Sequence, residues 1–335
     1  MLKITNIQAN CGDSFLIEDM DDPRKLLLDC GFKITYQHKI RQLTSSVDYL
    51  ILTHSDEDHI NGAIPLIEDM PHKFTVGKVY VNVPSSFEVR AGSGNISIHQ
   101  AITLEILLKR KNISYQSLLA GDTVDISKNV SLEIISPFRG DLEYFIGKYK
   151  EVRECSIPSP DPISKTSTII PFETLAENPD VYKSKKSDFT NAASIAFILK
   201  YKEKKLLFLG DAHPTVVTDY LEGKGFSEDK KYIFDYIKLS HHGSITSISK
   251  KFISMVSCSN YILSTNGGKA RSMHPSRETL AKLALNVDRN GSNDINFFFN
   301  YPVEKISSKN GILIRPEEKI EYNVNLIERS SFCII

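Results

Sequence analysis

The chain has no tryptophan, few cysteines and no excess of charge of either sign. Lysine plus arginine and aspartate plus glutamate number 41 each among 335 residues, so the formal net charge is zero. No global field therefore draws the protein to nucleic acid or to an anionic membrane, and a polyanionic substrate must be held by a local patch or by metal. The five cysteines are scattered and form no CxxC pair, which argues against a disulfide framework and a cysteine zinc site. We expect a reducing, cytoplasmic environment.

Long hydrophobic runs are also missing. The first six residues have neither the basic start nor the apolar stretch of a secretion signal. No apolar run approaches the roughly 20 residues that cross a bilayer. We therefore expect no membrane segment. Hydrophobic residues make up 41% of the chain and aromatic residues 9%, which is ordinary for a folded protein with a sizeable core.

Short apolar segments bounded by Gly and Asp predict a β-meander at the N-terminus, followed by alternating strands and helices. Strands are expected at 2–7, 14–18, 25–29, 47–52, 78–83, 130–135, 195–201, 205–209, 236–239 and 261–264, and helices at 60–70, 97–111 and 277–285. We expect one large domain over 1–290, with a surface insertion rich in Pro, Ser and Lys near 139–190. A β-rich extension over 291–335, with its strands between 295 and 320, is expected to pack on the same domain.

Polar side chains that can bind metal follow several of these strands. His54, Asp56, Asp58 and His59 fall within six residues, directly after the apolar segment 47–52. Loops at the carboxyl ends of strands are where α/β proteins place their chemistry. Four such groups at this density repel one another or compete for water unless a cation lies between them. Two further strands end in the same way, and their potential ligands are Asp211 and the pair His241-His242.

The spacing allows two ions on one loop. His54 and Asp56 would bind one and Asp58 and His59 the other, with Asp211 as a bridging carboxylate. Imidazole and carboxylate without thiolate suit zinc, manganese or iron, and the many carboxylates favour manganese. Taken singly, the acids could instead cap the helix that begins near residue 60. The histidine pair alone fits ordinary core or surface residues. The joint occurrence of all these groups at strand ends favours a metal centre.

Residues 53–62, with the letters THSDEDHING, resemble the HxHxDH loop of the metallo-β-lactamase fold, in the variant whose second histidine is aspartate. That variant is similar to the C-terminal hydrolase domain of the competence protein ComEC and its free-standing relatives. Further stretches resemble motifs of that family in the same order, namely 11–17, 26–31, 191–194, 238–244 and 273–275. The likeness covers about residues 4–285.

The resemblance implies an α/β fold, a four-layer αββα sandwich with two divalent metal ions, Zn²⁺ or Mn²⁺, along one edge. The metal ligands carried over are His54, Asp56, Asp58, His59, Asp211 and one histidine of the 241–242 pair, for which we prefer His241. The expected catalytic residues are Asp58, which would also orient the attacking water, His242 and His274. The residues expected to line the substrate space are Asn191, Ser194 and Ser244.

The chain departs from the family pattern at one ligand. Many members have another histidine between the first loop and the bridging aspartate, and this chain offers only His72 and His99 there. Both fit ordinary structural positions, and His213 is expected to cap the helix that follows it. The missing ligand leaves the occupancy of one metal site open.

These observations predict a metal-dependent hydrolase, specifically a phosphodiesterase or nuclease with DNA as its substrate. One alternative is a hydrolase of a small ester, lactone or phosphoester, with the insertion as a lid. Another is a non-catalytic sensor on the same scaffold, with a protein partner in a multi-gene system. The ComEC relatives that pass DNA are joined to membrane segments, so DNA uptake is not implied here.

Overall fold

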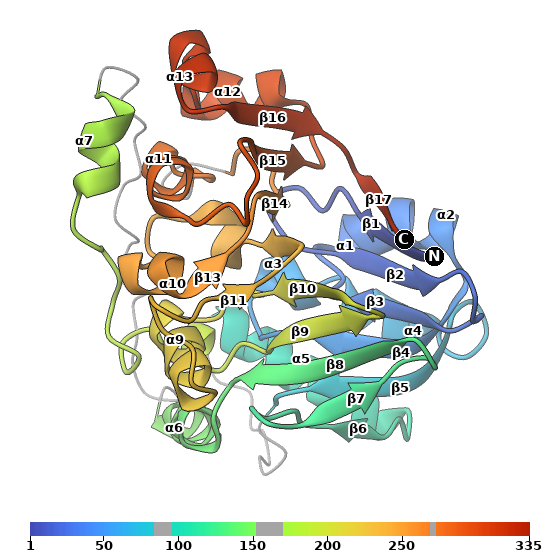
Figure 1. Cartoon of the computed structure of the whole chain (residues 1–335). Helices are drawn as coiled ribbons and strands as arrows, with labels where there is room; N and C mark the ends of the chain where they lie inside the picture. The colour runs from blue at the N-terminus through green and yellow to red at the C-terminus, as the bar shows by residue number, and fades with distance from the viewer. Residues whose placement is uncertain (84–95, 152–169, 269–272) are drawn as a thin grey trace.

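Two large sheets dominate the computed structural model, which describes residues 1–83, 96–151, 170–268 and 273–335 (Figure 1). The first sheet has the order β17-β1-β2-β3-β4-β5-β6 and the second the order β16-β15-β14-β12-β10-β9-β8-β7. The strands of the first are β1 (Leu2–Asn6), β2 (Phe15–Asp19), β3 (Lys25–Leu28), β4 (Ser46–Leu52), β5 (Thr75–Val81), β6 (Tyr115–Gln116) and β17 (Ser331–Ile334). Those of the second are β7 (Thr123–Asp125), β8 (Val130–Ser136), β9 (Ala196–Tyr201), β10 (Lys204–Phe208), β12 (Tyr236–Lys238), β14 (Asn260–Leu263), β15 (Ile295–Phe299) and β16 (Val324–Glu328). A small separate pair joins β11 (Tyr232–Ile233) to β13 (Val256–Ser257).

Strand direction brings the ends of particular strands to one edge. The antiparallel meander of β1, β2 and β3 is followed by parallel pairing of β3 with β4 and of β4 with β5. In the second sheet β10 pairs parallel with β12, and β12 with β14. Because parallel strands end on the same side of their sheet, the loops after β3 and β4 are neighbours, as are those after β10, β12 and β14.

Helices cover the outer faces of both sheets. They are α1 (Lys33–Thr35), the π-helical η1 (Tyr36–Ile40), α2 (Arg41–Leu43), α3 (Glu57–Ile60), α4 (Ala63–Asp69), α5 (Ile96–Arg110), α6 (Arg139–Glu151), α7 (Phe172–Glu177), α8 (Phe189–Ala192), α9 (Pro214–Gly223), the 3₁₀ turn η2 (Ser240–Gly243), α10 (Lys250–Met255), α11 (Arg277–Asn286), α12 (Val303–Asn310) and α13 (Pro316–Glu321). None of the helices in the described ranges has the length and apolar character that a bilayer crossing requires.

Three apolar cores separate four layers. The core between the sheets contains alternate residues of facing strands, such as Ile4 and Phe15 of the first sheet and Phe208 of the second. A second core packs β4 against α4 and α5, and the third packs the second sheet against α9, α10 and α11, which lie together at the left of Figure 1. The predicted αββα metallo-β-lactamase sandwich is confirmed.

One prediction for the periphery needs correction. The segment 295–320 contains a single strand, β15, followed by the helices α12 and α13. Pro316 stands at the first helical position, where its fixed φ and missing N–H suit a helix start. The described parts of the insertion near 139–190 contain the helices α6 and α7, and its Pro-rich centre, 157–162, lies outside the described residues.

Candidate metal centre

The loop after β4 is held by Asp29, the residue that follows β3. The Asp29 carboxylate accepts hydrogen bonds from the Thr53 backbone N–H at 2.7 Å and from the Thr53 hydroxyl at 2.8 Å. Asp56 occupies the N-cap position of α3, yet its side chain makes no capping hydrogen bond. The helix-capping explanation of these acids therefore fails for Asp56, whose carboxylate remains available to the centre.

One group of possible ligands surrounds His54. Its Nε2 atom lies 3.6 Å from Asp56 Oδ2 and 3.6 Å from Asp211 Oδ2. The opposite ring atom, Nδ1, lies 3.1 Å from the Thr53 hydroxyl and 3.4 Å from the Ser194 hydroxyl. These hydroxyl contacts fix the plane of the imidazole, so that Nε2 faces the two carboxylates.

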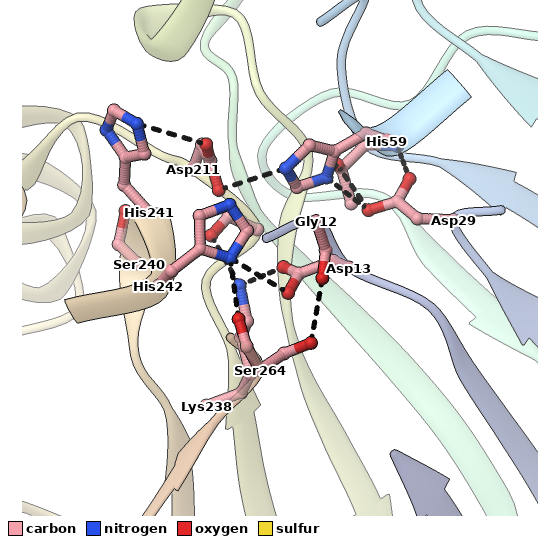
Figure 2. A network of polar contacts seen from close by, with 12 residues as sticks. Gly12, Asp13, Asp29, His59, Asp211, Lys238, Ser240, His241, His242 and Ser264 are labelled. Atoms are coloured by element: carbon pink, nitrogen blue, oxygen red, sulfur yellow. Dashed lines mark hydrogen bonds and ion pairs between the residues drawn. The ribbon is translucent and has the colours of Figure 1, made fainter. Parts of the chain in front are cut away.

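A second group surrounds His59. Its Nε2 atom lies 3.4 Å from Asp211 Oδ1, and its Nδ1 atom lies 2.8 Å from Asp29 Oδ2 (Figure 2). The same Nε2 atom lies 3.9 Å from Asp58 Oδ2. Burial alone would lower the pKa of His59, but the carboxylates of Asp211, Asp29 and Asp58 raise it well above its ordinary value. Without a metal ion, these acids favour the positively charged ring.

Asp211 lies between the two groups. Its Oδ1 atom faces His59 and its Oδ2 atom faces His54, and the residue is 3% exposed. Burial would raise the pKa of this carboxyl, but the surrounding imidazoles, chiefly those of His59, His241 and His54, hold it well below its usual range. The carboxylate is ionised and presents a different oxygen to each side.

Both histidines after β12 face the centre. His241 and His242 have φ values of 47° and 56°, an uncommon conformation for residues other than glycine. His241 Nε2 lies 3.9 Å from Asp211 Oδ2, whereas His242 Nε2 lies 3.1 Å from Asp58 Oδ2. His242 therefore belongs to a compact group of possible ligands with Asp58 and His59, whereas His241 lies nearer to Asp211. The left-handed turn aims both rings at the same edge, on either side of Asp211.

His274 lies beside this pair. Its ring centroid is 5.2 Å from that of His241 and 6.4 Å from that of His242. The residue is 5% exposed, and within the described ranges neither ring nitrogen has a hydrogen-bond partner. Burial, together with the charges of the neighbouring histidines, lowers its pKa well below the ordinary value, so the ring is neutral.

The residues predicted to line the substrate space differ in their contacts. Ser194 accepts a hydrogen bond from the Asp211 backbone N–H at 3.2 Å and so supports the centre itself. Ser244 bonds with the Thr246 hydroxyl at 3.0 Å, within its own turn. Asn191, in α8, leaves its buried Oδ1 atom without a partner. The assignment of these residues to substrate binding stays a prediction.

The other histidines lie outside the centre where they are described. His213 is the N-cap of α9 and accepts a hydrogen bond from the Thr215 N–H at 3.2 Å, which confirms its predicted capping role. His72 is exposed in the turn after α4. The side chain of His99 lies outside the described residues.

The donor atoms fit a metal ion. The buried atoms His54 Nε2, His59 Nε2 and Asp211 Oδ1 have no hydrogen-bond partner among the described residues, and these three residues offer ligand atoms that lie within 4.8 Å of one another. Buried polar atoms are rarely left without partners, so this group calls for an explanation. Ligand atoms about 2.1 Å from a tetrahedral ion lie about 3.4 Å apart, which matches the separations of 3.4 to 3.6 Å found here. The cluster is a metal site by the chemistry and the spacing of its donors.

Three supporting residues had no predicted role. Asp29 and Asp13 lie within stretches that carry the family resemblance, and Lys238 lies in β12 between apolar neighbours. A lysine in an apolar strand is itself informative, because such a side chain is rarely buried without an anionic partner. Here that partner is Asp13.

Comparison with known proteins agrees with this description. Residues 12–89 match the family model of the Metallo-beta-lactamase superfamily. The solved structures similar to this chain include the metallo-β-lactamase fold protein YhfI from Bacillus subtilis, with 13% identity, a TM-score of 0.43, and 99% of this chain and 98% of that chain covered. Zn²⁺-bound PqqB from Methylobacterium extorquens has 10% identity and a TM-score of 0.47, over 99% of this chain and 100% of that chain. Unliganded yeast PDE1 has 11% identity and a TM-score of 0.47, over 98% of both chains. No curated protein sequence matches.

The family match includes the loop of His54, Asp56, Asp58 and His59, and the two-sheet sandwich and the buried histidine and aspartate cluster are those expected of a metal-dependent hydrolase of this fold.

Proposed function

We propose that the centre holds two divalent ions and hydrolyses phosphodiester bonds, with DNA as the substrate. The observation that carries the proposal is the position of Asp211, whose two oxygens face two different groups of donors. A carboxylate bridging two cations about 3.5–4 Å apart is the usual arrangement of two-metal phosphoester hydrolases.

The ligands divide between the two sides of Asp211. His54 and Asp56 would hold one ion, and His241 is near enough to Asp211 Oδ2 to complete that side. Asp58, His59 and His242 would hold the other. In this arrangement both histidines of the 241–242 pair are ligands, and His241 supplies the ligand that the family pattern places between the first loop and the bridging aspartate.

The substrate class follows from the donor set and from His274. Seven aspartate and imidazole donors with no thiolate suit manganese or zinc, and the chemistry such cations supply is Lewis acidity at a phosphoryl oxygen and a lowered pKa of water. His274 is neutral and buried, and its ring nitrogens have no hydrogen-bond partner among the described residues, so its N–H can donate a hydrogen bond to a phosphate oxygen. The likeness of the motifs to the ComEC hydrolase domain also supports DNA as the polymer.

The test is hydrolysis by the purified protein with Mn²⁺ or Zn²⁺, on single- and double-stranded DNA, on RNA and on bis(4-nitrophenyl) phosphate. We expect metal-dependent cleavage of DNA that a chelator abolishes. His59→Ala should remove the activity with the fold retained, whereas His72→Ala, at an exposed histidine, should leave it unchanged. Turnover of small esters or lactones by metal-loaded protein that leaves every phosphodiester intact would refute the proposal and favour the small-molecule alternative.

A further inference from the structure

A buried ion pair lies directly behind the metal ligands and joins the two sheets. Lys238, the last residue of β12, pairs with Asp13, in the loop before β2. The side chains are 1% and 2% exposed. Within the described residues, only one other lysine or arginine pairs with a carboxylate while both side chains are this deeply buried: Arg277 with Glu318, at 1% and 3%.

Lys238 reaches the bridging aspartate through the backbone. Its Nζ atom donates a hydrogen bond of 3.0 Å to the carbonyl oxygen of Gly210, the residue before Asp211. The backbone N–H of His241 donates to the same oxygen at 3.1 Å. One carbonyl thus links the turn that carries Asp211 to the turn that carries the histidine pair, and Lys238 fixes its position (Figure 2).

Asp13 reaches the other side of the centre. Its Oδ1 atom lies 3.3 Å from His242 Nδ1, which donates at 2.9 Å to the carbonyl oxygen of Ser264. Both neighbours of Nδ1 are oxygen acceptors, so Nδ1 keeps its proton, and Nε2, 3.1 Å from Asp58 Oδ2, is the ring atom that can release its proton and bind metal. The Asp13 backbone N–H also donates to the Asp58 carbonyl oxygen at 3.2 Å.

The stability of the fold does not account for this pair. Removing two charges from water costs more than their mutual attraction returns unless the geometry is very good, and apolar pairs of similar volume are usually as stable or more so. A carboxylate behind a metal-binding imidazole, by contrast, fixes the tautomer and orientation of the ring. Asp29 does this for His59.

We propose that Asp13 and Lys238 are positioning residues of the metal centre, in which Asp13 sets the orientation of His242 and Lys238 sets that of the Gly210 carbonyl and of Asp211. The proposal rests on the two-metal site of the proposed function. It adds one requirement to that site: the ion pair must join the two sheets for the metal ligands of both sheets to come together.

The test replaces both partners at once, because Asp13→Asn alone leaves a buried lysine unpaired. In Asp13→Leu/Lys238→Met we expect a thermal midpoint equal to or above that of the wild type, with Zn²⁺ affinity lowered about 10- to 100-fold in a competition titration against a chromogenic chelator. In Asp13→Asn/Lys238→Met an oxygen acceptor again faces His242, so part of the affinity should return. The matched control is Arg277→Met/Glu318→Leu, which removes the other buried pair and should leave Zn²⁺ affinity unchanged.

Unchanged Zn²⁺ affinity in the folded Asp13→Leu/Lys238→Met variant would overturn the proposal. If Asp13→Leu/Lys238→Met and Asp13→Asn/Lys238→Met bind Zn²⁺ equally well, the role proposed for Asp13 is refuted. If the Leu/Met variant does not fold, the Asn/Met variant is compared with the wild type, and equal affinities again overturn the proposal. With bis(4-nitrophenyl) phosphate at saturating Zn²⁺, kcat should fall while KM stays unchanged. Because the titration needs no substrate, it stands even if the wild type cleaves no phosphodiester.

Discussion

Asp29→Asn is the sharpest test of the centre. The wild-type carboxylate is fully buried and accepts three hydrogen bonds, two from Thr53 and one from His59 Nδ1. An asparagine of the same shape can still accept from the Thr53 N–H through its oxygen. Its NH₂ group, however, then faces His59 Nδ1 and donates to it. The proton of the neutral imidazole is driven to Nε2, the atom that has to bind metal.

The expected magnitudes follow from these contacts. Loss of the group that orients a metal-binding histidine lowers metal affinity about 10- to 100-fold, which is about 1.4 to 2.8 kcal/mol. The metal-free protein loses an acceptor for the Thr53 hydroxyl, and a buried donor left without a partner costs about 1–3 kcal/mol of unfolding free energy. The effect on metal binding should therefore be comparable to the effect on folding and measurable separately from it.

The measurements are a Zn²⁺ competition titration and urea unfolding of the metal-free protein. Asp48→Asn is the control, because Asp48 also accepts from a backbone N–H, that of Lys25, but is exposed and lies near the start of β4, at the opposite end of that strand from the ligand loop. It should change neither quantity appreciably. A folded Asp29→Asn protein with wild-type Zn²⁺ affinity would refute the tautomer argument.

Further predictions concern steric fit, a hydrogen bond to the substrate, and pH. Gly12→Ala places a Cβ atom against the Asp58 carbonyl oxygen, so we expect lower stability and weaker metal binding by thermal unfolding and titration; an unperturbed variant would contradict the structure. His274→Ala should lower kcat about 10²- to 10³-fold with the metal content unchanged, as measured by phosphodiester hydrolysis and metal analysis. Burial raises the pKa of Glu318, but hydrogen bonds from Arg277 and its neighbours lower it to about 2. Its folded pKa is depressed, so its stabilisation is present above about pH 4.5 and is lost as the pH falls toward 2. Glu318→Gln should remove this part of the pH dependence in urea unfolding, and an unchanged slope would contradict it.

The sequence predicted β1 to β5 and the ligand loop because both depend on local patterns, whereas β6 and β17 were not predicted. The alternation in β1 and the apolar runs of β2 and β4 identify strands, and the ligands follow strand ends within a few residues. The helices α12 and α13 were missed because they have only eight and six residues, with few apolar side chains between them.

The supporting contacts could not be predicted, because they join residues distant in the chain. Asp29 meets His59 at a separation of 30 residues, and Lys238 meets Gly210 at a separation of 28. Which oxygen of Asp211 faces which histidine depends on how the two sheets are packed. The preference for His241 over His242 rested on distance from the strand end, whereas the left-handed turn brings both rings to the centre.

The ligands come from both sheets, and this governs when a metal ion can be captured. Asp58 precedes His242 by 184 residues, which a ribosome takes roughly 10–40 s to add. During that interval the growing chain contains only part of the ligand set, which can bind an ion only weakly. Tight metal binding is therefore possible only after the ligands of the second sheet have been synthesised. A proteolytic cut between the two halves of the chain that lets them separate would release the ion and abolish the activity.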